Sequence, residues 1–134
     1  MNFLQHPRVV ALARAAFWIA LVFAVVMAVI PSPPHTPIDR FGDKFAHMLA
    51  FATLAGLAMT GFGAELRWRI LERLSFLGAM IEVVQSIPAL NRDCDIRDWI
   101  ADSVAVLVVV AAMSLLLPRR ADSSLAVPID SALG

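Results

Sequence analysis

Residues 15–30, AAFWIALVFAVVMAVI, contain no charged side chain and are the stretch that decides the fold class of this chain. Val9 to Ala13 extend this apolar stretch past the lone charge of Arg14, which makes it long enough for the ~20 residues of a transmembrane helix. The long stem of Arg14 can place its guanidinium group among the lipid headgroups. Pro31 and the prolines after it end the helix. The sequence therefore begins with a predicted membrane span.

Further apolar segments follow at Phe45–Phe62, Leu74–Leu90 and Trp99–Leu117. The whole chain of 134 residues is 60% hydrophobic and 16% charged, whereas a soluble domain has about a quarter charged residues. The fold class that we predict is all-α: a polytopic membrane protein built as a four-transmembrane-helix bundle. Residues 63–77 mix arginines with apolar residues at helical spacing. We expect them to lie along the inner interface before the third span begins.

The lysines and arginines predict the orientation, because cytoplasmic loops carry more of them than outer loops. The larger group lies before the first span, between the second and third, and after the fourth: Arg8, Arg14, Arg67, Arg69, Arg73, Arg119 and Arg120. The smaller group is Arg40, Lys44, Arg92 and Arg97. Both termini are therefore expected in the cytoplasm. We divide the chain into a cytoplasmic N-terminal segment (1–14), the transmembrane domain (15–117) and a disordered cytoplasmic tail (118–134).

Composition also limits the partners. The net charge is zero, which gives no basis for nucleic-acid binding. Cys94 is the single cysteine and has no intrachain disulfide partner. The sequence holds no zinc-type cysteine pair, no HExxH and no P-loop. We expect membrane lipids as partners, and neither a cofactor nor a resident metal.

Polar side chains gather in the outer halves of three predicted spans. These residues are His47 in the second span, Glu82 and Gln85 in the third, and Asp98 and Asp102 in the fourth. An ionisable group at the centre of a membrane helix costs at least ~2.5 kcal/mol, so these helices should turn their polar faces together. The sequence predicts a polar pocket that opens to the outer surface, under the charged loop 89–98.

Structural explanations for the same residues stay open at this point. Asp43 directly precedes the second span and suits a helix N-cap. Asp95 and Asp98 suit the positive end of the fourth helix. His47 could form a hydrogen bond between helices with no further role. Glu82 is the hardest of these residues to explain by structure alone, because a carboxylate within a membrane helix is a functional hypothesis by default.

Two motifs resemble those of the VanZ-like family of small integral membrane proteins. The first motif, D-K-x-x-H-x-x-x-F-x-x-L, corresponds to Asp43, Lys44, His47, Phe51 and Leu54. The second, E-x-x-Q followed by P, R and D, corresponds to Glu82, Gln85, Pro88, Arg92 and Asp98. The resemblance covers residues 15–117. The family commonly has an asparagine four residues after the last aspartate, where this chain has Asp102.

The resemblance implies a bacterial cytoplasmic (inner) membrane protein of the cell envelope, from a family named for glycopeptide antibiotic resistance. Our first hypothesis is binding or modification of a lipid-linked cell-envelope precursor. The residues expected to bind this ligand are Asp43, Lys44, Gln85, Arg92, Asp98 and Asp102, with Arg97 as a further phosphate contact.

Two alternatives belong to other classes of function. One is a membrane-embedded hydrolase or transferase that acts on a lipid phosphate headgroup, with His47 and Glu82 as acid and base or with assistance from a divalent metal. The other is a proton-coupled carrier, with Glu82 as the proton site.

Overall fold

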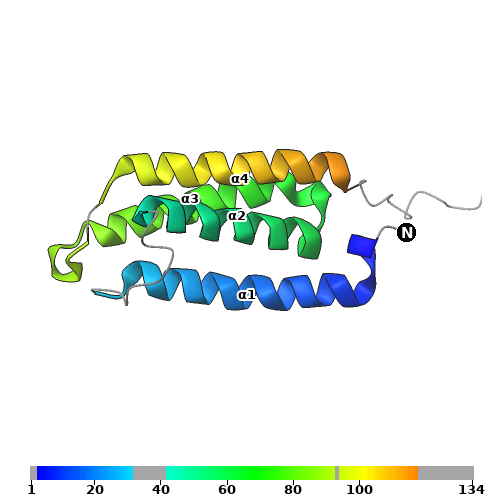
Figure 1. Ribbon diagram of the computed structural model, residues 1–134, viewed down its shortest axis with the longest axis horizontal. Coiled ribbons are helices and arrows are strands. Elements are labelled where there is room, and N and C mark those ends of the chain that lie inside the picture. Colours follow the sequence, from blue (N-terminus) through cyan, green and yellow to red (C-terminus); the bar gives the residue numbers. More distant parts are fainter. Residues whose placement is uncertain (1–2, 32–41, 93, 118–134) are drawn as a thin grey trace, which may run out of the picture.

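The computed structural model describes residues 3–31, 42–92 and 94–117, without the side chain of Asp43. The described residues form helices and no strand (Figure 1). The α-helices are α1 (Pro7–Val29), α2 (Asp43–Phe62), α3 (Arg67–Gln85) and α4 (Ile96–Leu116). The short 3-10 helices are η1 (Phe3–Gln5), η3 (Ala64–Leu66) and η4 (Pro88–Leu90).

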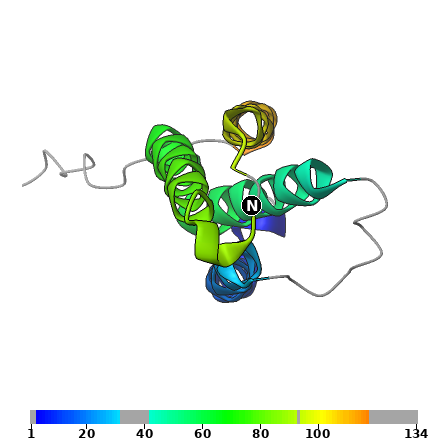
Figure 2. The same cartoon turned by 90° about the vertical axis from the view of Figure 1, so that its left-hand side faces the viewer.

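The four α-helices run along one long axis as a bundle. In the end-on view α2 and α3 lie between α1 on one side and α4 on the other (Figure 2). Helix α2 is the most deeply placed, because Leu54, Ala55 and Met59 are almost completely buried. Small residues on α2 let its neighbours approach closely. The structure is therefore all-α, as predicted.

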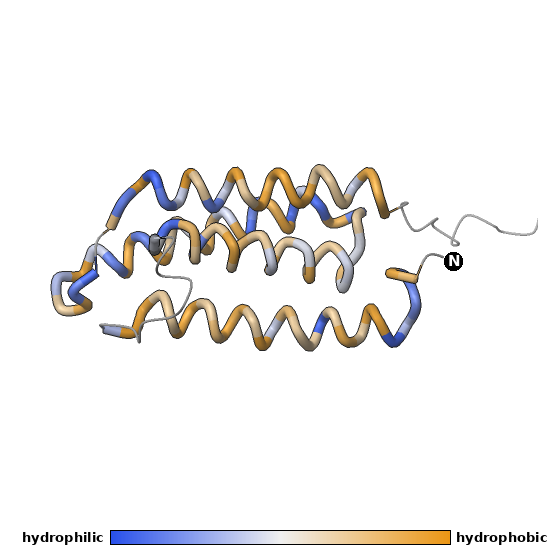
Figure 3. The backbone as a smooth tube through the Cα atoms, viewed as in Figure 1, coloured by the Kyte–Doolittle hydropathy of each residue, from blue (hydrophilic) through white to orange (hydrophobic). Residues whose placement is uncertain are grey.

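Three of these helices are long and apolar enough to cross a membrane: α1, α2 from Lys44, and α4. Their outward faces are apolar, and on α1 Ile19, Val22 and Phe23 are all exposed. Figure 3 shows hydrophobic residues along α1 and α4, with hydrophilic residues gathered where α3 connects to α4. Helix α3 carries more charge, with Arg67, Arg69, Glu72, Arg73 and Glu82 in its sequence.

The bounds of the third helix differ from those predicted. Helix α3 starts at Arg67 and ends at Gln85, whereas the apolar segment suggested Leu74–Leu90. The expected interfacial segment 63–77 is not separate: after η3, its later residues belong to one continuous helix. The reason is a buried stripe of Ile70, Leu74, Gly78 and Ile81 at helical spacing, which continues through the arginines.

The end of α3 changes the position of two predicted site residues. Pro88 follows three residues after Gln85 and starts η4, and a helix rarely continues into a proline. Glu82 and Gln85 therefore lie in the last turn of α3, closer to the end of the helix than in the predicted span to Leu90. Helix α1 also begins at Pro7, inside the segment 1–14.

Arg14 joins α1 to the end of α2. Its Nε donates a 2.7 Å hydrogen bond to the carbonyl oxygen of Gly61, and its guanidinium carbon lies 5.6 Å from the centre of the Phe62 ring. A helix end leaves its last carbonyl groups without intrahelical partners. Arg14 supplies such a partner, in addition to any contact with headgroups.

Candidate functional site

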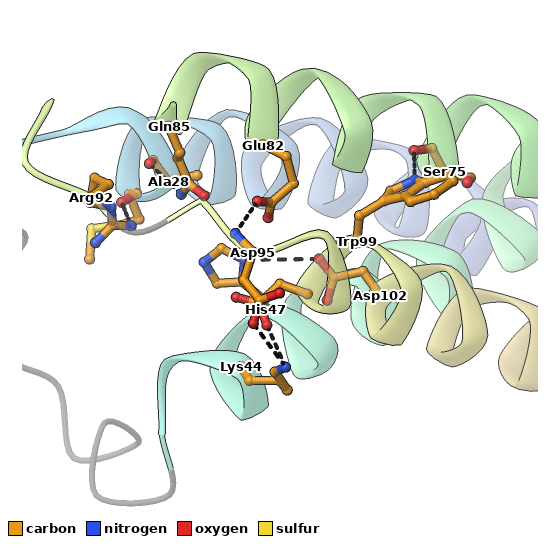
Figure 4. A network of polar contacts seen from close by, with 12 residues as sticks. Ala28, Lys44, His47, Ser75, Glu82, Gln85, Arg92, Asp95, Trp99 and Asp102 are labelled. Carbon is orange, nitrogen blue, oxygen red and sulfur yellow. Dashed lines mark hydrogen bonds and ion pairs between the residues drawn. The ribbon is translucent and has the colours of Figure 1, made fainter. Parts of the chain in front are cut away.

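The first turns of α2 and α4 lie at the same end of the bundle and are joined by an ion pair. Lys44 Nζ lies 2.8 Å from Asp98 Oδ1 and 3.9 Å from Asp95 Oδ2. The Lys44 side chain is 45% exposed and that of Asp98 is 15% exposed. Lys44 therefore reaches solvent at the end of the bundle while its charge is balanced by α4 (Figure 4).

A second pair lies one turn deeper between the same two helices. His47 Nδ1 is 3.9 Å from Asp102 Oδ2, and the two side chains are only 12% and 4% exposed. His47 follows Lys44 by three residues and Asp102 follows Asp98 by four, so each helix presents both of its residues on one face. The two pairs form a ladder that leads from the surface into the bundle (Figure 4). We call these four residues the α2–α4 ladder.

Glu82 reaches the N-terminus of α4 from α3. It is buried, and its Oε2 accepts a 3.0 Å hydrogen bond from the backbone N–H of Asp95. Asp95 is the N-cap of α4, and its own carboxylate accepts a 2.9 Å hydrogen bond from the N–H of Arg97. The capping alternative for Asp95 is thus confirmed. Figure 4 shows the Glu82 carboxylate pointing toward Asp95.

Gln85 and Arg92 turn toward α1. Gln85 Nε2 donates a 2.9 Å hydrogen bond to the carbonyl oxygen of Ala28. Nη2 of Arg92 donates a 3.2 Å hydrogen bond to the carbonyl oxygen of Met27. Both acceptors belong to the last turn of α1, whose carbonyl groups need partners from outside the helix. These two predicted ligand-binding residues therefore hold the α3–α4 connection against α1.

The remaining predicted residue, Asp43, is the first residue of α2, and the N-cap position belongs to Gly42 with a φ of 95°. The expectation that Asp43 is the N-cap is therefore wrong. Gly42 takes that position because its backbone conformation favours glycine. The predicted ligand contact of Asp43 falls on a side chain outside the described part of the structure.

Polar contacts deeper between α3 and α4 were not predicted from the sequence. The hydroxyl groups of Ser75 and Ser103 lie 2.8 Å apart, and Trp99 Nε1 donates a 2.9 Å hydrogen bond to the Ser75 carbonyl oxygen. Gly78 makes room for the Trp99 ring, because a Cβ there would be 3.2 Å from Trp99 Cδ1. The glycine and the tryptophan were the available signals, but their pairing depends on the register of the two helices.

The electrostatics of the site are predominantly acidic. The carboxylates of Asp95 and Asp98 lie near Lys44, and that of Asp102 lies near His47. The Glu82 carboxylate bonds to the backbone at the N-cap of the same helix α4. In the connection above them, desolvation by the surrounding protein and a hydrogen bond to Glu82 raise the pKa of the Cys94 thiol, although the residue is exposed. Among the described residues, no His, Cys, Asp and Glu side chains converge as a metal-binding group.

No protein-family model, curated protein or solved structure matched this chain.

Proposed function

We propose that this chain is a VanZ-like protein that crosses the bacterial cytoplasmic membrane with four helices and has both termini in the cytoplasm. On its outer side it binds or modifies a lipid-linked component of the cell envelope. Three sufficiently apolar helices support membrane insertion. Helix α3 has 19 residues, or ~28 Å at 1.5 Å per residue, which is close to the ~30 Å hydrocarbon core.

The position of the charges on α3 supports its role as the fourth span. Arg67, Arg69 and Arg73 lie within its first two turns, where arginine side chains can extend to the headgroups. Glu82 lies in its last turn and is buried against the N-terminus of α4. The middle of α3 therefore carries no charged residue from Leu74 to Ile81.

The observation that carries the proposed activity is the His47–Asp102 pair in the α2–α4 ladder, in which Asp102 is buried and His47 is largely covered. Buried ion pairs are often no more stabilising than well-packed apolar residues, so stability alone explains poorly why this pair lies within an apolar bundle. Imidazole accepts and donates protons near neutral pH. In our proposal His47 exchanges a proton with the bound headgroup, and Asp102 orients the ring through Nδ1.

The cationic residues give the headgroup its place. Lys44 is half exposed at the mouth of the ladder, where a phosphate oxygen can replace Asp98 or Asp95 as its partner. Arg92 has five N–H donors, and its described bond to Met27 uses an Nη2 donor. The excess of carboxylates limits the number of phosphate charges that this site accepts.

An acid/base hydrolase or transferase acting on a lipid phosphate headgroup is the second candidate. The observation that favours it over simple binding is that two side chains able to exchange protons, His47 and Glu82, lie against the N-cap and first two turns of α4. General acid–base catalysis typically contributes 10²–10⁴-fold to a rate. The two candidates therefore differ in whether the ligand leaves chemically changed.

The test uses Glu82→Gln and His47→Ala in cells from which the native protein has been deleted. A glutamine at position 82 can still accept the hydrogen bond from Asp95, so we expect Glu82→Gln to fold and to melt near the wild-type temperature. Sensitivity to a glycopeptide antibiotic should match that of the deletion strain. Ser86→Ala is the control, because Ser86 is the exposed C-cap of α3 and its hydroxyl donates to the carbonyl oxygen of Val83 in the preceding turn.

Two outcomes would contradict the proposal. If deletion changes the sensitivity but both variants behave as wild type, the cluster only holds the helices together. If lipid extracts of the purified wild-type protein contain no lipid-linked phosphate above the level found with Glu82→Gln, the site does not bind such a headgroup.

A further inference from the structure

Arg14 is the only charged residue in the apolar sequence from Val9 to Ile30. Its guanidinium group lies against the end of α2. There its Nε donates a 2.7 Å hydrogen bond to the carbonyl oxygen of Gly61, and its central carbon lies 5.6 Å from the centre of the Phe62 ring. These two contacts fix the position of the guanidinium group between α1 and α2.

Most of the hydrogen-bonding capacity of this group is still available. The bond to Gly61 uses one of the five N–H donors of an arginine, and it is the only side-chain hydrogen bond of Arg14 among the described residues. Within the same part of the chain, no carboxylate forms an ion pair with Arg14. The side chain is exposed on the outside of the bundle, and a charge in a membrane helix is costly unless it is paired. The anion that balances this charge therefore has to come from outside the described bundle.

The depth of Arg14 places phospholipid phosphate groups next to it. Gly61 follows Lys44 along α2 by 17 residues, or ~26 Å at 1.5 Å per residue. With Lys44 at the outer headgroups, as proposed, Gly61 and Arg14 lie close to the inner edge of the ~30 Å hydrocarbon core. While the bond to Gly61 holds the guanidinium group, it cannot extend further toward water. The nearest anion is then the phosphate of a phospholipid in the cytoplasmic leaflet.

Trp18 lies beside Arg14 on the same face of α1, because residues four apart are neighbours on a helix. It is 56% exposed and lies ~6 Å further toward the middle of the membrane. Its ring packs edge-on against Phe17, with 5.3 Å between the ring centres, and Phe17 packs in the same way against Phe62. A lipid with its phosphate at Arg14 therefore has the first part of its acyl chains against Trp18.

We propose that Arg14 and the end of α2 form a binding site for the phosphate of an anionic phospholipid in the cytoplasmic leaflet. Guanidinium groups bind phosphate through pairs of parallel hydrogen bonds, and one already held by Gly61 and Phe62 loses little freedom on binding. A zwitterionic headgroup carries a cation of its own, so a headgroup with net negative charge is preferred. This inference rests on the proposed membrane insertion and orientation. It assigns a second lipid to the opposite end of the bundle from the α2–α4 ladder.

The test measures quenching of Trp18 fluorescence in a protein that carries Trp68→Phe and Trp99→Phe. This protein is reconstituted into vesicles with four phosphatidylcholine molecules for each phosphatidylglycerol. Bromine atoms near the top of the acyl chains are placed either on the phosphatidylglycerol or on an equal number of phosphatidylcholine molecules. Both leaflets contain both lipids, so the direction of insertion into the vesicles does not affect the result.

We expect brominated phosphatidylglycerol to quench Trp18 at least about twofold more strongly than brominated phosphatidylcholine, because arginine attracts anionic lipid to its vicinity. Arg14→Gln should make the two lipids quench equally. Arg8→Gln is the matched control: it removes the same charge from an exposed position at the start of α1, and the preference should remain. If Arg8→Gln reduced the preference as much as Arg14→Gln, the basic end of the bundle would attract anionic lipid without a specific site, and the proposal would be overturned.

Unchanged quenching by brominated phosphatidylcholine shows that Arg14→Gln is still folded and inserted. If it is not, Arg14→Lys takes its place, since lysine keeps the charge but cannot form the paired hydrogen bonds of a guanidinium group. The preference should then fall by at least half, and a preference equal to that of the arginine protein would contradict a guanidinium site.

The same measurement separates this site from membrane insertion. Equal quenching by the two lipids in the protein that retains Arg14 would refute the phosphate site alone, and the antibiotic assay of Glu82→Gln would be unaffected. Absence of quenching by either lipid would mean that Trp18 does not face the bilayer. In that case the site and the proposed membrane protein would both be wrong.

Discussion

Glu82 Oε2 accepts a 3.0 Å hydrogen bond from the backbone N–H of Asp95, which connects the last turn of α3 to the N-cap of α4. The bond closes the connection between the two helices. It also keeps a buried carboxylate at the positive end of α4, where a negative charge is favoured. Glu82 therefore has a structural task in addition to the proposed chemical one. Removing its charge while keeping an acceptor separates the two.

The thiol of Cys94 provides a direct measure of the Glu82 charge. Desolvation and the hydrogen bond to Glu82 raise the pKa of Cys94, so less reactive thiolate is present at a given pH. Between pH 7 and 9 we expect iodoacetamide to alkylate Cys94 more slowly than a free cysteine peptide. Glu82→Gln should lower the thiol pKa and increase the rate at pH 8.

The control for this measurement is Asn91→Cys combined with Cys94→Ser, since Asn91 is exposed in the same connection. Its alkylation rate should not respond to Glu82→Gln. Identical pH–rate curves for Cys94 with and without Glu82→Gln would show that the carboxylate does not act on the thiol.

Gln85 should contribute to stability through its bond to α1. Gln85→Leu removes the donor to Ala28 and leaves a buried carbonyl oxygen without that partner, which costs about 1–3 kcal/mol in the free energy of unfolding. Ser86→Ala, at the next residue, is the comparison. Because this side chain is exposed, we expect its substitution to change the free energy of unfolding by less than about 0.5 kcal/mol. Denaturation in detergent measures both. A Gln85→Leu protein as stable as Ser86→Ala would mean that Gln85 is available for a ligand.

The sequence was sufficient for the helices whose pattern is uniform. Helix α1 was predictable because residues 15–30 are apolar without interruption. The proximity of His47 to Asp102 followed from the positions of their polar faces. The bounds of α3 were not predictable from hydropathy, since its buried stripe of Ile70 and Leu74 runs between arginines. The partners of Gln85 and Arg92 were not predictable either, because backbone carbonyl groups are present at every residue and leave no signal in the sequence.

Close packing of α1 on α2 predicts a difference between two glycines of α2. A Cβ at Gly61 would lie 3.0 Å from Arg14 Cγ and 3.1 Å from the Arg14 backbone nitrogen, whereas at Gly56 the nearest atom is Met113 Sδ at 3.8 Å. We expect Gly61→Ala to reduce the free energy of unfolding by about 1–3 kcal/mol. Gly56→Ala should be neutral or slightly stabilising, because alanine favours the helix. Equal melting temperatures for the two variants would contradict the packing described here.

The proposed orientation predicts which cysteines react from outside the cell. In a Cys94→Ser background, a membrane-impermeant maleimide should label Asn91→Cys in cells with a permeabilised outer membrane. It should not label Arg69→Cys until the cytoplasmic membrane is opened. Both positions are exposed on the bundle, so protection of Arg69→Cys would come from the membrane. Labelling of Arg69→Cys in intact cytoplasmic membranes would reverse the assignment of the termini.

The role proposed for Asp102 predicts the tautomer of His47. A carboxylate near Nδ1 favours a proton on that nitrogen. Nitrogen chemical shifts of protein labelled with ¹⁵N-histidine should therefore show His47 protonated at Nδ1, with the signal identified by its loss in His47→Gln. Asp102→Ala removes this carboxylate and should shift the population toward the Nε2–H form.

Asp98→Ala is the matched control one turn away. It leaves Lys44 near Asp95 and should leave the tautomer of His47 unchanged. If both substitutions changed the histidine signal equally, the effect would come from the packing of α2 on α4, and Asp102 would have no specific role in orienting the ring.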